Sequence, residues 1–81
     1  QAFKHDFFDA IDQNQLSLAD ALKAMRKITG MTQVEYAQFT GVAPRIVIDI
    51  ERGVGNPTLK SLQKIAQPFG LTLGFKRISS T

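Results

Sequence analysis

The chain has 81 residues, of which 43% are hydrophobic, and it contains no cysteine. This length gives one domain with a single small core, for which self-association is a common source of extra stability. The absence of cysteine excludes disulfides, thiol catalysis and cysteine-ligated metal, and it favours a reducing, intracellular compartment. No apolar run approaches the roughly 20 residues of a membrane span and no leader pattern is visible, so we expect a soluble protein.

The charge is distributed unevenly along the chain. The formal net charge is +3, but residues 1–20 hold one Lys and four Asp, so residues 21–81 carry nine basic against three acidic side chains. A phosphate-bearing partner would be attracted to this basic part, in a way that weakens with salt. A solvated basic surface that only serves solubility is the alternative.

The first expected element, within residues 1–16, is an amphipathic helix. Aspartates occupy its polar faces, and one face carries the apolar residues Phe3, Phe7, Phe8 and Ile11. The acidic residues argue against a DNA-binding arm, and the phenylalanines favour packing on the body of the domain over binding a second subunit or another protein. His5 has no partner pattern for metal or catalysis, so we place it on the surface.

A supporting helix follows. Ser17 can cap its start, with Asp20 in the reciprocal position, and Gly30 ends it. Its apolar residues recur at steps of three and four along Leu18, Ala21, Leu22, Met25 and Ile28.

Residues 32–53 predict two short helices joined by a tight turn. Thr32 and Glu35 form a capping-box pattern at the start of the first helix. Gly41 suits the left-handed position that ends this helix, and Pro44 suits the first turn of the second. One apolar seam joins the two helices through Tyr36, Ala37, Val42, Val47 and Ile50. The pattern indicates a helix-turn-helix, with an ordinary helical hairpin as the alternative.

The next segment predicts one more helix. Asn56 can cap it, Pro57 opens it, and Pro68 with Gly70 marks its end. We expect its inward side chains to be Leu59, Leu62, Ile65 and Ala66.

Residues 71–78 change to a period of two, which is typical of a strand. Leu71, Leu73 and Phe75 alternate with Thr72, Gly74 and Lys76. Because the chain offers no second strand, we expect this one to pair with its copy across a homodimer. A disordered tail and an edge awaiting a different protein are the alternatives.

These residues resemble the Xre, or Cro/repressor-type, helix-turn-helix family over about residues 18–70. The resemblance is carried by Arg26, Gly30, Met31, Thr32, Gln33, Glu35, Ala37, Gly41, Val42, Val47, Glu51, Gly53, Pro57, Leu62, Ile65 and Ala66. The preceding SLADALKAMR and the following LTLGFKRI are most similar to the HipB-type antitoxins, which dimerise partly through a C-terminal strand.

The resemblance implies roles for single residues. Arg26 would pair with Glu51, since either charge alone would be costly to bury. Thr32 and Gln33 would lie at the DNA backbone, where the Gln33 backbone N–H binds phosphate at a helix start, and Asn56 could do the same. Arg52 and Lys60 are further phosphate candidates beside the motif. The second helix of the motif would present Ala43, Pro44, Arg45, Ile48 and Asp49 to the major groove.

The reading surface departs from the family pattern. A polar Ser or Thr is usual near Ala43, Ile46 and Ile48, and a polar residue usually stands where Phe39 precedes Thr40. Arg45 can bind guanine, and Asp49 can accept a hydrogen bond from cytosine. With only these two side chains, direct hydrogen-bonded readout of the bases is limited. Either DNA shape supplies specificity, or Ile46 and Ile48 serve the core or a partner.

Together these features predict a mainly α fold: a four- to five-helix, lambda-repressor-like helix-turn-helix domain with one C-terminal strand. The expected parts are an N-terminal helix (1–16), a DNA-binding domain (17–70) and a dimerisation segment (71–81) that uses Leu71, Leu73 and Phe75. The expected function is a dimeric, bacterial, cytoplasmic, nucleoid-associated repressor of a palindromic operator. As an antitoxin it would also neutralise a HipA-like serine/threonine kinase toxin and regulate its own operon.

Two other functions remain open: a free-standing phage-type repressor, and a protein-interaction module of the same fold without DNA binding. An enzyme is not expected, because the chain has one His, no Cys, no Gly-rich phosphate loop and no paired carboxylates in a plausible cleft. No cofactor, metal or membrane partner is expected either.

Overall fold

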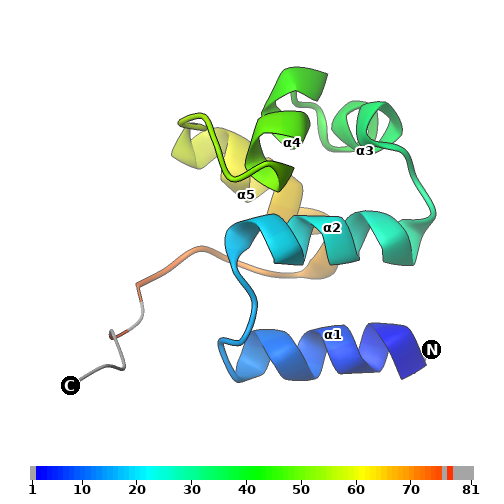
Figure 1. The fold of residues 1–81 in the computed structure, drawn as a ribbon, viewed down its shortest axis with the longest axis vertical. Helices are drawn as coiled ribbons and strands as arrows, with labels where there is room; N and C mark the ends of the chain where they lie inside the picture. The colour runs from blue at the N-terminus through cyan, green and yellow to red at the C-terminus, as the bar shows by residue number, and fades with distance from the viewer. Residues whose placement is uncertain (1, 76, 78–81) are drawn as a thin grey trace.

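The computed structural model describes residues 2–75 and 77, and this part of the chain is helical. Its elements in order are α1 (Ala2–Asp12), α2 (Leu18–Thr29), α3 (Gln33–Thr40), α4 (Pro44–Glu51), α5 (Leu59–Ala66) and the short 3-10 helix η1 (Gln67–Phe69). In Figure 1, α2 lies in the middle of the molecule, with α1 below it and α3 and α4 above it. The mainly helical prediction is confirmed. The side chain of Phe3 and residue Ile78 lie outside what the structure describes.

The core lies where α2, α3, α4 and α5 meet. Tyr36, Leu22 and Val47 are its largest fully buried side chains. The hydroxyl of Tyr36 donates a hydrogen bond to the carbonyl of Ile65 at 2.9 Å, which satisfies the one polar atom of this side chain. Burial raises the pKa of Tyr36 to about 12. The predicted seam is confirmed, because Tyr36, Ala37, Val47 and Ile50 are buried and Val42 packs against them.

The helix starts in the first half of the chain follow the sequence signals. The Ser17 hydroxyl accepts from the Asp20 backbone N–H at 3.1 Å, and α2 begins after it. Thr32 and Glu35 form the reciprocal capping box that begins α3. Gly41 adopts the left-handed conformation at φ 80°, which lets the chain leave α3 and enter α4 three residues later, at Pro44.

The predicted start of α5 was wrong. Thr58, rather than Asn56, is the N-cap: its hydroxyl accepts from the Ser61 backbone N–H at 3.1 Å. Pro57 therefore lies before the helix, in the connecting loop. The prediction that Leu59 faces inward was also wrong, since it is 61% exposed, while Ile65 and Ala66 are buried as expected.

The expected C-terminal strand is not present in the structure. Residues 71–75 and 77 form neither helix nor strand. A strand requires a neighbouring backbone, and the described part of this single chain offers none. Leu71 instead packs against the core, while Phe75 is fully exposed.

The N-terminal helix packs on the domain. Phe7 in α1 is 3% exposed. Its ring meets Phe8 at 5.3 Å and Phe69 of η1 at 5.5 Å between centroids, both edge to face. This arrangement agrees with the expectation that the phenylalanines serve packing.

None of the helices in residues 2–75 and 77 is long and apolar enough to cross a membrane.

Candidate nucleic-acid interface

The turn between α3 and α4 is built from backbone hydrogen bonds. The backbone N–H groups of Gly41 and Val42 both donate to the carbonyl of Ala37, at 2.9 and 3.0 Å. The Thr40 hydroxyl donates to the Tyr36 carbonyl at 2.8 Å. The Ala37 carbonyl in the last turn of α3 is thereby satisfied, and α4 begins at Pro44.

The inner face of α4 is held by packing at its middle and by charge at its end. Val47 and Ile50 are buried in the core. Glu51, the last residue of the helix, has a side chain that is only 4% exposed and lies against Arg26 of α2. Arg26 donates two hydrogen bonds to it, from Nε to Oε2 at 2.7 Å and from Nη2 to Oε1 at 2.9 Å. This is the two-pronged geometry in which an arginine binds a carboxylate most strongly.

A third residue joins this ion pair from the start of α3. The Gln33 side-chain amide donates to Glu51 Oε1 at 3.2 Å. Arg26 Nη1 also donates to the Met31 carbonyl in the α2–α3 connection at 3.3 Å. The network of Arg26, Gln33 and Glu51 therefore links α2, α3 and α4 at one point, and the two helices of the motif are tied together at both ends.

The electrostatics of the network favour its charged form. Burial raises the pKa of Glu51, but hydrogen bonds from Arg26 and Gln33, with the charges of Arg26 and Lys23, outweigh this and lower it overall. The hydrogen bond to Glu51 raises the pKa of Arg26 against an opposing effect of burial. Each partner thus keeps the other ionised.

The outer face of α4 is open to solvent at its start. Ala43, Pro44 and Arg45 are exposed, and the Arg45 side chain is 74% accessible. Ala43 caps α4 without a side-chain hydrogen bond, so no polar side chain occupies this helix end. An exposed arginine on the first turn of such a helix can reach the edge of a base.

Asp49, one turn after Arg45, is more buried than its predicted role as a base contact suggests. Its side chain is 27% exposed, and its Oδ1 lies 3.8 Å from Arg45 Nη1. It also packs under Gly55, where an added Cβ would lie 3.0 Å from the Asp49 Cβ. A small hollow of about 130 Å³ is lined by Ile46, Asp49, Asn56 and Pro57. Asp49 and Asn56, two predicted contact residues, therefore meet at the loop after α4.

The two isoleucines that departed from the family pattern differ in environment. Ile46 packs against the core cluster. Ile48 is half-buried, and by helical spacing it lies on a flank of α4, turned away from Val47 and Ile50. Core packing thus accounts for Ile46, while Ile48 remains available on the outer face.

The residues predicted to contact the DNA phosphate backbone are spread around the outer face of α4. Thr32 is exposed and Gln33 is half-buried at the start of α3, where the network of Arg26, Gln33 and Glu51 lies. Arg52 and Asn56 are exposed in the segment after α4. Lys60 is exposed on α5 and makes no side-chain hydrogen bond or ion pair with any described residue. Thr32 and Gln33 therefore lie together at the start of α3, and Asp49 and Asn56 lie together at the loop after α4. Lys60 lies on a different helix, α5.

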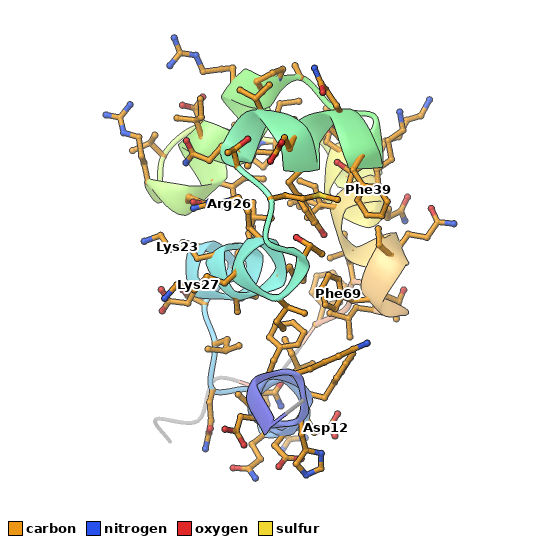
Figure 2. The ribbon with its side chains drawn as sticks, turned by 90° about the vertical axis from the view of Figure 1, so that its right-hand side faces the viewer. Asp12, Lys23, Arg26, Lys27, Phe39 and Phe69 are labelled. Atoms are coloured by element: carbon orange, nitrogen blue, oxygen red, sulfur yellow. The ribbon has the colours of Figure 1, made fainter. Side chains whose placement is uncertain are left out.

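Sequence reasoning missed three features of this surface. It assigned a role to the backbone of Gln33 but not to its side chain; the polar residue at the first position of α3 was the available signal. It did not predict the contact made by Lys64, whose Nζ lies 3.4 Å from the Gly41 carbonyl at the end of α3. It also missed Lys23, whose charge acts on Glu51 and which Figure 2 shows beside Arg26 and Lys27 on α2.

Comparison with known proteins agrees with this geometry. A family model described as "Helix-turn-helix" matches residues 22–76, a region that contains α3 and α4 and begins after α1. A curated protein of Methanocaldococcus jannaschii, named as an uncharacterized HTH-type transcriptional regulator, is 36% identical over 56 residues. That alignment covers 69% of this chain and 85% of the relative. No solved structure matches the chain significantly.

Proposed function

Because the chain belongs to the Xre-type helix-turn-helix family, we propose that it is a transcriptional regulator that binds double-stranded DNA sequence-specifically through α4. One observation carries the proposal: the two faces of α4 have opposite environments. The inner face is fixed by Val47, Ile50 and the buried Glu51, while the outer face exposes Arg45 at its first turn. A helix that is rigidly held on one side can present the other to the major groove.

In the proposed complex, Arg45 reads a guanine through O6 and N7, with Ala43, Pro44, Ile48 and Asp49 forming the rest of the reading surface. The ion pair with Asp49 is long and exposed, so Arg45 can leave it for a base at little cost. The backbone N–H of Gln33, the Thr32 hydroxyl, Arg52, Asn56 and Lys60 are the proposed phosphate contacts. With few polar side chains on α4, part of the specificity comes from DNA shape.

The test compares Arg45→Ala with Lys60→Ala on an operator selected from a random DNA pool. Arg45→Ala should cost about 1–3 kcal/mol of binding free energy and relax the preference at one base position. Lys60→Ala should weaken binding to all sequences alike and reduce the salt slope by about 1. Fluorescence anisotropy at several salt concentrations measures both effects. If Arg45→Ala left affinity and preference unchanged, the proposed orientation of α4 would be wrong.

We also propose that the DNA-binding form is a homodimer on a palindromic site, with Leu71, Leu73 and Phe75 at the contact. Phe75 supports this proposal, because a fully exposed phenylalanine gains most from a partner that covers it. A Phe75→Ser variant should sediment as a monomer at concentrations where the parent is dimeric. Equal sedimentation of the two proteins would exclude Phe75 from the interface.

The proposed biological role is that of an autoregulating antitoxin that neutralises a HipA-like kinase. Its support is the sequence resemblance of residues 17–26 and 71–78 to the HipB type. Coexpression with the product of the neighbouring reading frame tests it: a kinase-like product that is toxic alone and harmless with this chain supports the role. A phage integrase or lysis gene next to the coding sequence would instead favour a free-standing repressor.

A protein-interaction module of the same fold is the competing function. It predicts that affinity for DNA shows no steep dependence on salt and no preferred palindrome. The anisotropy measurements on Arg45 and Lys60 therefore decide between the two functions as well.

A further inference from the structure

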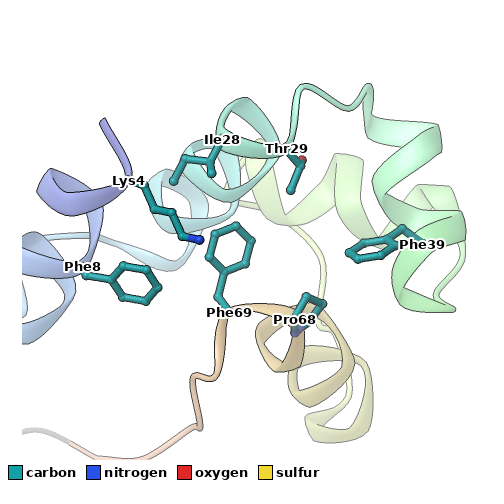
Figure 3. A pocket seen from close by; sticks show the side chains of 7 residues that line it. All are labelled: Lys4, Phe8, Ile28, Thr29, Phe39, Pro68 and Phe69. Carbon is teal, nitrogen blue, oxygen red and sulfur yellow. The ribbon is translucent and has the colours of Figure 1, made fainter. Parts of the chain in front are cut away.

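A second concave site lies away from the outer face of α4, between α1, α2, α3 and η1. This cleft has a volume of about 460 Å³. Its walls are the rings of Phe8, Phe39 and Phe69 with the aliphatic side chains of Ile28 and Pro68. Figure 3 shows Phe8 and Phe69 at one end and Phe39 at the other, with Thr29 and Pro68 on opposite sides between them. The volume and the mainly apolar lining are those of a small-molecule site, for which about 300–1,000 Å³ is usual.

The two end walls of the cleft come from different parts of the chain. Its α1 wall lies before the region that matches the helix-turn-helix family. Its far wall is Phe39 of α3. Phe39 is 54% exposed, and its ring rests on the buried Tyr36 at 6.1 Å between centroids, so it is supported from the core side and open on the cleft side. Figure 2 shows Phe39 and Phe69 on the same side of the molecule.

The cleft has few polar groups, and their charge indicates which charge a complementary ligand would carry. The Thr29 hydroxyl already donates within α2, to the carbonyls of Met25 and Arg26 at 3.1 and 2.9 Å. Lys4, on α1, is exposed and forms no ion pair with any described residue. Its ammonium is the one charged group among the residues that line the cleft. An apolar cleft with one unpaired cation at its edge is complementary to an apolar molecule with one acidic group.

We propose that this cleft binds a small amphipathic carboxylate, with an aromatic or aliphatic body between Phe39, Phe69 and Pro68 and its carboxylate at Lys4. Four separate elements surround the site within a limited volume, which suits a compact molecule better than a helix about 10 Å across. The site is independent of the proposed DNA contacts, since none of them lines the cleft.

The experiment uses the full chain and two matched probes, 4-phenylbutyrate and 4-phenylbutanol, which share the apolar body and differ in the acidic group. Two-dimensional ¹H–¹⁵N NMR titrations give the affinity and the position of binding. We expect saturable shifts at the backbone amides of Phe8, Thr29, Phe39 and Phe69, with tighter binding of the acid than of the alcohol.

Substitutions separate the two parts of the site. Lys4→Gln should weaken phenylbutyrate about two- to fivefold, as for loss of an exposed ion pair, and leave phenylbutanol unchanged. Phe39→Ala should weaken both probes about three- to tenfold, as for loss of one ring contact. Lys27→Gln and Leu59→Ala are the controls, because both residues are exposed and lie outside the cleft. Both controls should bind the probes like the parent.

Three results would overturn the proposal. The first is equal affinity of Lys4→Gln and the parent for phenylbutyrate. The second is a set of shifts centred on another groove, such as the one lined by Leu16, Leu62 and Leu73. The third is a shift of the cleft amides on raising the protein concentration without any probe, since a second copy of the chain would then occupy the cleft. Far-UV circular dichroism of each variant verifies that it is folded.

Discussion

The helices on the two sides of α2 are held in different ways. On one side, α3 and α4 are tied to α2 through Arg26, Gln33 and Glu51, by hydrogen bonds of 2.7 to 3.2 Å. On the other side, the rings of Phe7 and Phe8 hold α1 against Phe69 of η1, with centroids 5.3 to 6.3 Å apart. Ring packing covers a surface but tolerates small rotations, whereas a two-pronged ion pair fixes direction. The directional contacts are found where the orientation of a helix matters for the proposed function.

The largest loss of stability is expected on the aromatic side. Phe7 is 3% exposed and contacts two other rings, so Phe7→Ala should lower the free energy of unfolding by about 3–5 kcal/mol. Urea denaturation measures this change. Phe39→Ala is the matched control, because that ring is 54% exposed, and it should cost much less. DNA affinity of the folded Phe7→Ala protein should equal that of the parent, since the hydrogen bonds of the network of Arg26, Gln33 and Glu51 involve no residue of α1.

Arg26→Ala should be nearly as destabilising but should also affect DNA binding. It leaves the Glu51 carboxylate buried without its main partner, which costs about 3 kcal/mol, near the lower end for buried pairs because Arg26 keeps 26% exposure. The end of α4 then loses its tie to α2, and DNA affinity should fall at temperatures where the variant is folded. Equal losses of DNA affinity in Phe7→Ala and Arg26→Ala would contradict the view that only the ion pair sets the orientation of α4.

A double variant sharpens the interpretation of the ion pair. Arg26→Met combined with Glu51→Met leaves no unpaired charge, so it should recover most of the stability that Arg26→Ala loses. DNA affinity should recover less, because apolar side chains do not reproduce the direction of two hydrogen bonds. Full recovery of both quantities would show that the pair acts only through burial.

A smaller effect is expected from Gln33. Gln33→Ala removes one hydrogen bond to Glu51 and should cost about 1 kcal/mol of unfolding free energy. Gln38→Ala on the same helix is the control, because Gln38 is exposed and makes no side-chain hydrogen bond with the described residues. If Gln33 contacts phosphate through its backbone N–H, as proposed, Gln33→Ala should leave DNA affinity close to that of the parent. A large loss of affinity would assign the contact to the side chain.

The sequence predicted the parts of this molecule that depend on local chemistry. Thr32 with Glu35 predicted the start of α3, and Gly41 with Pro44 predicted the turn, because capping and left-handed φ values are set within a few residues. The prediction of Asn56 as the cap of α5 was wrong. Asn56 and Thr58 both have side chains that can cap a helix, and in the structure Thr58 does so.

Features that depend on distant residues were harder to predict. The alternation from Leu71 to Phe75 is a strand pattern, but a strand also needs a neighbouring backbone, which no local pattern supplies. The bond from Gln33 to Glu51 joins residues 18 positions apart, and no spacing rule predicts it. The same holds for the cleft between Phe39 and Phe69, which exists only because α1 and η1 meet beside the end of α3.

The smallest effect is expected from acid. In the folded protein the pKa of Glu51 is held below its ordinary value of 4.5. As the pH falls, the unfolded chain therefore takes up this proton before the folded chain does. The stability that Glu51 contributes is therefore complete above about pH 5 and is lost as the pH falls through the lowered folded pKa. Urea midpoints of the parent and of Glu51→Gln, measured from pH 7 to pH 3, isolate this carboxyl from the others. The difference between the two proteins should be constant from pH 7 to 5 and shrink below that; a difference that grew in acid would mean that burial, rather than Arg26 and Gln33, controls the carboxyl.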